Sequence, residues 1–105
     1  MPTETHLKIL KHIQTNPNVS QRQLAEELGV SVGKVNYCLR SLIDKGFVKA
    51  SNFKRSTNKL SYLYLLTPSG IEKKTKLTLN FMKIKMQEFD DLKKDLKNEE
   101  RKKKN

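Results

Sequence analysis

A chain of 105 residues has room for one domain and an appended element, and its 22 Lys and Arg against 11 Asp and Glu leave a formal charge of +11. This excess favours a polyanionic partner, nucleic acid first and an anionic membrane second. No stretch approaches about 18 consecutive apolar residues, and the N-terminus lacks a signal-peptide pattern, so we expect no membrane span. The single cysteine excludes a disulfide within one chain, and the cytoplasm is the expected location.

The first predicted element is a helix over residues 3–16, because Leu7, Leu10 and Ile13 recur at helical spacing along one face. The run Asn-Pro-Asn at residues 16–18 ends it, since proline and asparagine favour a turn. We therefore expect one apolar face that packs against the elements that follow.

The stretch from Gln21 to Arg40 has the packing pattern of a helix-turn-helix. Ala25 supplies the small side chain that two steeply crossing helices need where they touch, and Gly29 tolerates the positive φ of the sharp turn between them. Apolar residues fill the shared core: Leu24, Leu28, Val30, Val35, Cys38 and Leu39, with Leu42 and Ile43 further on. The pattern predicts helices over residues 20–28 and 31–45.

Local capping signals mark the ends of these two helices. Ser20 followed by Gln23 is a capping-box pattern, and Ser31 can cap the second helix. Gly46 is the expected left-handed residue just past the end of that second helix.

The second helix of the motif is left with an outward polar face, and in helix-turn-helix proteins that face enters the DNA major groove. We predict that Tyr37 and Arg40 read bases, whereas Ser31 at the helix N-terminus lies near a phosphate. Packing against the first helix is the alternative for Tyr37. The predicted recognition surface comprises Ser31, Lys34, Asn36, Tyr37, Arg40 and Ser41. The predicted phosphate contacts of the preceding helix are Ser20, Gln21 and Arg22.

Residues 47–50 and 60–66 are rich in strand formers and flank a polar, basic stretch at 52–58, which predicts a β-hairpin. Helix, helix-turn-helix and hairpin in this order indicate a winged helix-turn-helix, a mainly α fold with a small β-hairpin wing. We predict that the wing binds the DNA backbone or minor groove, with a solvated loop as the alternative. The predicted wing contacts are Lys54, Arg55, Ser56, Thr57 and Lys59.

A last helix is predicted to begin with Thr67 as its N-cap and Pro68 at its first position, and neither proline nor glycine follows Gly70. It can run for about 30 residues, or roughly 45 Å, which is longer than a winged domain is wide. The sequence therefore predicts a winged domain over residues 1–67, a long helix over 68–98 and a frayed basic tail over 99–105.

Apolar residues of this long helix fall at the a and d positions of consecutive heptads, which predicts a dimerisation coiled coil. The predicted dimerisation residues are Leu79, Met82, Met86, Phe89 and Leu96, with Lys93 at the a position between the last two. Leu77, Phe81, Ile84 and Leu92 broaden the stripe. The alternative is that this face packs on its own domain, and the pattern leaves open whether paired helices run parallel or antiparallel.

Taken together, the chain resembles the winged-helix transcription regulators of the MarR type, and within them the short branch of exopolysaccharide-associated regulators. The likeness covers roughly residues 4–95 and rests on SQRQLAEELGVSVGKVNYCLRSLIDKGFVK, the wing and LYLLTPSGIEKK. It implies a bacterial, DNA-binding homodimer on a pseudo-palindromic operator, with exopolysaccharide-related genes as possible targets.

Two departures from the resemblance matter. Larger members of the family have an Asp-x-Arg signature in the wing, whereas the tip here reads Lys-Arg-Ser-Thr-Asn and leaves the minor-groove contact to Arg55 or Lys54. Larger members also dimerise through N- and C-terminal helices that enclose a small-ligand pocket. This chain begins close to the first winged-domain helix, so the sequence predicts no particular effector.

Other classes of function fit the residues less well. His6 and His12 lie on different faces of one helix and Cys38 faces the core, so we predict no metal, no cofactor and no enzyme. A winged-helix adaptor that binds protein is the main alternative, but it needs no basic recognition face. Membrane attachment through the long helix is more remote, because the polar face of that helix also carries acids and its apolar stripe has no Trp.

Overall fold

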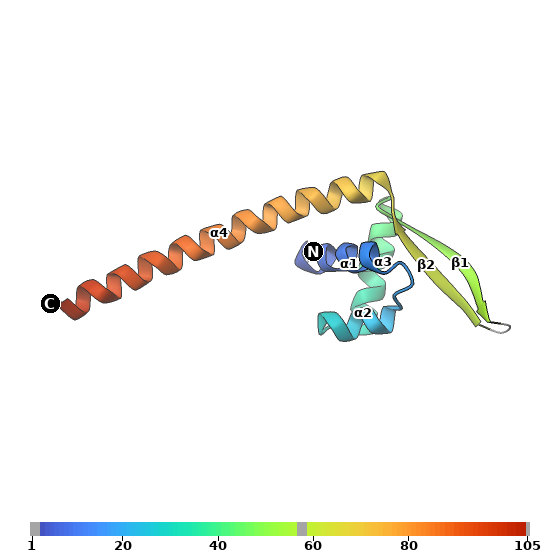
Figure 1. Ribbon diagram of the computed structural model, residues 1–105, viewed down its shortest axis with the longest axis horizontal. Helices are drawn as coiled ribbons and strands as arrows, with labels where there is room; N and C mark the ends of the chain where they lie inside the picture. Colours follow the sequence, from blue (N-terminus) through green and yellow to red (C-terminus); the bar gives the residue numbers. More distant parts are fainter. Residues whose placement is uncertain (1–2, 57–58, 105) are drawn as a thin grey trace.

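The computed structural model describes the backbone of residues 3–56 and 59–104 and the side chains of residues 4–51 and 62–103. The elements in chain order are α1 (Thr3–Thr15), α2 (Gln21–Leu28), α3 (Val32–Asp44), β1 (Val48–Ser56), β2 (Lys59–Leu66) and α4 (Pro68–Lys104). Helices α1 to α3 form a small bundle, the hairpin extends to one side, and α4 leaves toward the other as a long rod (Figure 1). The predicted fold class, a mainly helical winged helix-turn-helix followed by a long helix, is confirmed.

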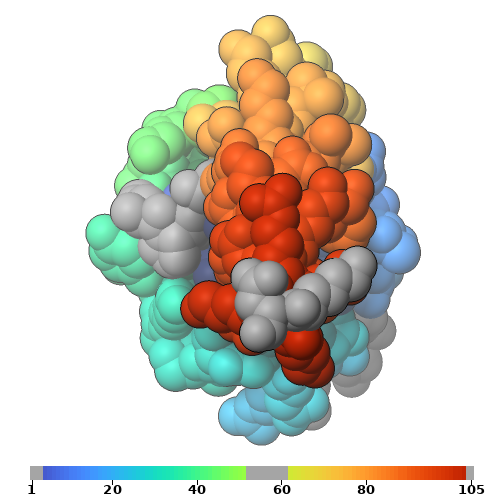
Figure 2. Space-filling view, turned by 90° about the vertical axis from the view of Figure 1, so that its left-hand side faces the viewer, coloured from blue at the N-terminus to red at the C-terminus, as the bar shows by residue number. Residues whose placement is uncertain are grey.

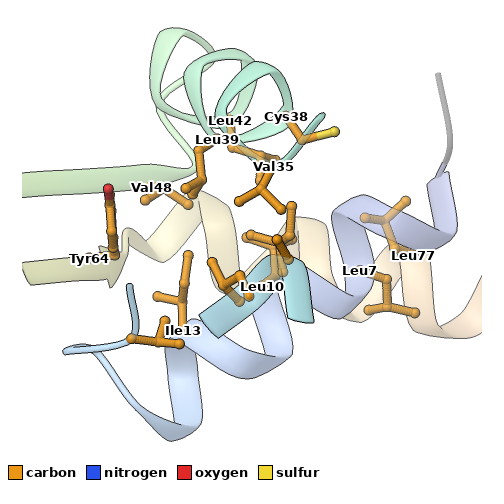
Figure 3. Close-up of a cluster of buried hydrophobic side chains, with 14 residues drawn as sticks. Leu7, Leu10, Ile13, Val35, Cys38, Leu39, Leu42, Val48, Tyr64 and Leu77 are labelled. Carbon is orange, nitrogen blue, oxygen red and sulfur yellow. The ribbon is translucent and has the colours of Figure 1, made fainter. Parts of the chain in front are cut away.

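The core lies where the bundle meets the base of the hairpin (Figure 3). Its fully buried side chains are Ile9, Leu10, Ile13, Leu24, Val35, Cys38, Leu39 and Leu42. Val48 and Tyr64 from the two strands and Leu77 from α4 complete it. The helix-turn-helix residues Leu28, Val30 and Ile43 lie at the margin of this core, partly buried against it. The apolar spacing therefore predicted the inner faces of all three short helices.

The capping predictions are also confirmed. The Ser20 hydroxyl accepts a hydrogen bond from the Gln23 N–H at 3.0 Å, and the Gln23 side chain accepts one from the Ser20 N–H at 3.0 Å. The Ser31 hydroxyl accepts from the Lys34 N–H at 3.1 Å. Gly29 has φ 69° and Gly46 has φ 78°, so both occupy the left-handed region that side chains disfavour.

The hairpin is longer than its apolar residues predicted. Strands β1 and β2 pair antiparallel from Val48 opposite Leu66 out to Ser56 opposite Lys59, with a register shift between Lys54 and Ser56. The stretch 52–56, expected to be a loop, therefore has strand backbone. Backbone pairing satisfies the N–H and C=O groups of both arms, so a hairpin that projects from its domain can extend without apolar side chains.

The start of α4 is fixed against the turn after α3. The Thr67 hydroxyl accepts from the Gly70 N–H at 3.0 Å, as expected of an N-cap, and the Thr67 N–H donates to the Phe47 carbonyl at 3.1 Å. Gly70 is buried, and a Cβ there would lie 1.9 Å from the Phe47 carbonyl oxygen. Only glycine lets the first turn of α4 approach the domain this closely, a requirement that no sequence pattern indicated.

The far end of α4 differs from the sequence prediction. The helix continues to Lys104, so the tail over 99–105, expected to be frayed, is helical to that residue. Glu, Arg and Lys are good helix formers, and Glu99 and Glu100 lie four residues before Lys103 and Lys104, which favours pairing along the helix. The molecule measures 74 × 26 × 21 Å as a result. Along the described helices, none is long and apolar enough to span a membrane.

Candidate DNA-binding surface

Helix α3 presents the predicted recognition surface because its opposite side is anchored in the core. Val35, Cys38, Leu39 and Leu42 are at most 1% exposed and fix the rotation of the helix about its own axis. Lys34 and Arg40 then lie on the outside, and Tyr37 is 64% exposed. The alternative of Tyr37 packing against α1 is therefore wrong.

Three cations, Arg22, Lys34 and Arg40, lie on the exposed surface of α2 and α3. Within the described part of the chain, no carboxylate lies within 4.0 Å of Arg22, Lys34 or Arg40. The first turn of α3 has no acid, and its N-terminus carries the partial positive charge of the helix dipole next to the exposed Ser31. An anion such as a backbone phosphate would meet attraction here without displacing an ion pair.

Two predicted DNA contacts, Asn36 and Gln21, are hydrogen-bonded to each other. The Asn36 Nδ2 donates to Gln21 Oε1 at 3.2 Å, and the Gln21 Nε2 donates to the Tyr64 hydroxyl at 3.2 Å. Both amides are half-buried, whereas Tyr64 is 4% exposed. This chain of hydrogen bonds joins α3, α2 and β2, so it fixes the recognition helix relative to the wing.

The sequence did not indicate this amide–tyrosine chain, because its members are 15 and 43 residues apart. The sequence pattern indicates Tyr64 only as a strand former. Next to it on β2, the ring of Tyr62 stacks on that of Tyr64 with centroids 6.0 Å apart, and Tyr62 is 53% exposed. Strand β2 therefore presents an exposed aromatic side chain that is not among the predicted site residues.

The remaining predicted contacts divide into two groups. Ser20 is exposed but occupied in its capping box, Arg22 is exposed, and Ser41 is half-buried. The wing residues Lys54, Arg55, Ser56 and Lys59 have strand backbone, but their side chains, and Thr57 entirely, lie outside the described residues. The predicted wing contacts therefore stay predictions.

Neither Cys38 nor His6 forms a reactive site. Burial raises the pKa of the Cys38 thiol above its ordinary value, although Lys34 acts in the opposite direction. Burial, with the nearby charges of Lys45, the N-terminus and Lys73, lowers the pKa of His6. Among the described residues, the buried Nε2 of His6 has no hydrogen-bond partner, which suits a neutral imidazole. Among the described side chains, no group of three His, Cys, Asp or Glu residues could hold a metal ion.

A groove of about 210 Å³ lies between α1 and the proximal part of α4. Leu7, Leu77, Phe81 and Ile84 line it, together with Glu4, Asn80, Lys85 and Glu88. Small-molecule sites usually enclose about 300–1,000 Å³, so this groove is smaller than typical. We assign no ligand to it.

Comparison with known proteins agrees with this arrangement. Residues 2–49 match the family model described as winged helix-turn-helix DNA-binding. No curated protein matches the sequence. Among solved structures, the PcaV transcriptional regulator of Streptomyces coelicolor, solved with its natural ligand, is similar with a TM-score of 0.66 and 16% identity, over 76% of this chain and 55% of that one.

Two further solved structures are similar at low identity. FabT of Streptococcus pneumoniae, solved in complex with DNA, has a TM-score of 0.59 and 23% identity over 82% of this chain and 58% of its own. A MarR-family protein of Mycobacterium tuberculosis, solved with p-aminosalicylic acid, has a TM-score of 0.57 and 23% identity over 71% of this chain and 55% of its own. This chain spans little more than half the length of these neighbours. The likeness shows the fold alone, and it agrees with the winged helix-turn-helix that the family model matches.

Proposed function

We propose that this chain is a transcription regulator that binds double-stranded DNA sequence-specifically through α3 and the wing and acts as a homodimer. A two-fold dimer presents two recognition helices, so its operator is pseudo-palindromic, with half-sites about one helical turn, or roughly 10 base pairs, apart.

The observation that carries DNA binding is the outer surface of α3. Lys34, Tyr37 and Arg40 project from a helix whose other side is locked in the core. The chain as a whole has a formal charge of +11, which provides the non-specific attraction to phosphate on which specific reading builds. An adaptor that binds protein needs no basic face on α3, and among the described residues Lys34 and Arg40 form no ion pair, so this surface favours DNA.

The observation that supports a dimer is the free apolar stripe of α4. Leu79, Met82, Met86, Phe89 and Leu96 are 52–64% exposed. Single exposed apolar residues are common, but a heptad series of them is what a partner helix covers. The resemblance to the exopolysaccharide-associated branch adds one candidate set of target genes, which genome-wide mapping of bound sites would test.

Selection of bound sequences from random duplexes, followed by affinity measurements on the selected site, tests the proposal. Arg40→Ala should weaken binding by about 1–3 kcal/mol and relax selectivity at one base position if its contact is bidentate. The matched control is Lys11→Ala, which removes one charge from the exposed surface of α1 and should leave selectivity unchanged. Recovery of no common sequence, with equal weakening by both variants, would favour the adaptor.

A further inference from the structure

Helix α4 has two apolar faces, of which one packs on the domain and the other is exposed. Leu77 is 7% exposed and Phe81 is partly buried, and both pack toward the core. Successive residues of an α-helix turn by about 100°, so Leu79 lies about 160° around the helix from Leu77. The apolar pattern alone groups Leu77 and Phe81 with the dimerisation stripe, but in the structure they belong to the domain-facing side.

The second face stays uncovered along the whole distal part of the helix. Every residue whose side chain is described from Met82 onward is exposed. In side view, the distal part of α4 extends away from helices α1 to α3 (Figure 1), and Figure 2 looks along it from its C-terminal end. Leu79 to Leu96 span about 26 Å of helix, so a partner helix can lie along this face without displacing α1.

The charge along α4 is asymmetric about the middle of this apolar stripe. Residues 76–87 carry Lys76, Lys83 and Lys85 and no acid, a net charge of +3. Residues 88–99 carry five acids (Glu88, Asp90, Asp91, Asp95 and Glu99) against three lysines (Lys93, Lys94 and Lys97), a net charge of −2. Over these two twelve-residue segments, a parallel pair would place like charges side by side, whereas an antiparallel pair places the basic segment of each helix against the acidic segment of the other.

The position of Lys93 independently favours antiparallel pairing of the two α4 helices. It occupies an a position, and in a parallel pair the a residues of the two helices meet, so two ammonium groups would face each other. In an antiparallel pair, a residues meet d residues, so Lys93 meets Met82 of the partner subunit. The Lys93 ammonium already lies 5.3 Å from the centroid of its own Phe89 ring, which lets its apolar stem face the seam.

We propose that α4 pairs with α4 of a second copy in an antiparallel coiled coil centred between Gln87 and Glu88. In this register Leu79 meets Leu96 of the partner subunit, and Met86 meets Phe89 of the partner subunit. Lys83 faces Asp90 of the partner subunit on the flank. The two winged domains then dock at opposite ends, where their Leu77 residues are separated by about 32 Å along the rod. This inference rests on the proposed homodimer and adds its direction and register.

Cross-linking through one introduced, exposed cysteine per chain tests whether the helices run parallel or antiparallel in the full-length chain. Leu79→Cys and Leu96→Cys are made separately, and each is treated with a short bismaleimide, alone and after mixing and subunit exchange. In the antiparallel pair, two copies of Cys at 79 are about 26 Å apart, beyond the reach of the linker. Covalent dimer is therefore expected only in the mixture. The parent chain is the control, because its Cys38 is 1% exposed.

Two other results would contradict either the antiparallel direction alone or the homodimer as well. If either variant alone forms a covalent dimer as readily as the mixture, the helices are parallel, and the inference fails while the homodimer stands. If sedimentation of the parent shows only monomer at the concentrations used, both the inference and the homodimer fail. DNA binding measured on the same samples remains a separate result.

Charge reversal gives a second readout of the register. Lys83→Glu or Asp90→Lys alone should raise the dimer dissociation constant, and the two together should restore it, because these residues face each other across the antiparallel pair. In a parallel pair, Asp90 instead faces Lys85 of the partner subunit. Rescue of Asp90→Lys by Lys85→Glu, and not by Lys83→Glu, would overturn the antiparallel register.

Discussion

The winged domain and the distal half of α4 contain the same kinds of apolar residues at the same helical spacing, but the two regions solve different packing problems. Ile9, Leu10 and Leu24 are 0% exposed, whereas Met86, Phe89 and Leu92 are 60–66% exposed. The domain finds partners for its apolar faces within one chain, because three helices and a hairpin surround one core. The distal part of α4 extends beyond that core, so its apolar face is exposed. Periodicity therefore indicates that a face will be buried, and only the fold decides against what.

Truncating a core residue should have the largest effect, a loss of stability that the same change on the distal part of α4 should not cause. Leu39→Ala leaves a cavity among α1, α3 and the hairpin and should lower the free energy of unfolding by about 2–5 kcal/mol in urea denaturation at fixed protein concentration. Leu92→Ala is the matched control, because Leu92 is 66% exposed and lies outside the a and d positions. A loss below about 0.5 kcal/mol for Leu39→Ala would mean that the core is not packed as described.

The next largest effect is expected at the free stripe. The double variant Met86→Glu with Phe89→Glu places four carboxylates at the centre of a paired helix and should weaken dimerisation by at least about 3 kcal/mol, or roughly 100-fold. Sedimentation measures the dimer, and circular dichroism should show an intact winged domain. Asn98→Glu is the control, because it is an exposed change on the opposite side of α4. It should leave both dimerisation and the winged domain unchanged. Loss of the fold in the double variant would show that the distal helix supports the domain.

The wing should show a smaller effect that varies with salt. Replacing Lys54, Arg55 and Lys59 by alanine should weaken binding to any duplex and reduce the slope of log affinity against log salt by about one per lost phosphate contact. This loss should be equal for selected and random sequences, unlike that of Arg40→Ala. A triple variant that binds like the parent would make the wing a solvated loop.

Local signals predicted the winged domain well, because its helix ends and inner faces depend on residues a few positions apart. The Ser20–Gln23 capping box, Gly29 and Gly46 are of this kind. The sequence failed where distant segments meet. It did not indicate that Gly70 must be small against Phe47, that Leu77 faces the domain, or that Asn36 and Gln21 bond to each other. The site residues on α3 followed from the motif, but the amide–tyrosine chain behind them did not.

Breaking the chain of hydrogen bonds from Asn36 through Gln21 to Tyr64 should have the smallest effect of the changes considered. It also distinguishes a residue that supports the fold from one that contacts DNA. Tyr64→Phe removes only the hydroxyl that accepts the Gln21 amide at 3.2 Å and keeps the buried ring. A single neutral hydrogen bond contributes about 0.5–1.5 kcal/mol, so the free energy of unfolding should fall by that amount or less. If the bond fixes α3 relative to the wing, DNA affinity should fall as well, because the two contact surfaces are less well aligned.

Gln21→Ala separates this alignment from a direct phosphate contact. If Gln21 acts only through Tyr64 and Asn36, Gln21→Ala should lower DNA affinity about as much as Tyr64→Phe, and the double variant should add little, because both break the same chain of bonds. If Gln21 contacts a phosphate, as the sequence first suggested, Gln21→Ala should cost more than Tyr64→Phe, and the two losses should add. Affinities of the two single variants and the double variant, measured on one selected duplex at fixed salt, therefore decide whether Gln21 belongs to the fold or to the DNA interface.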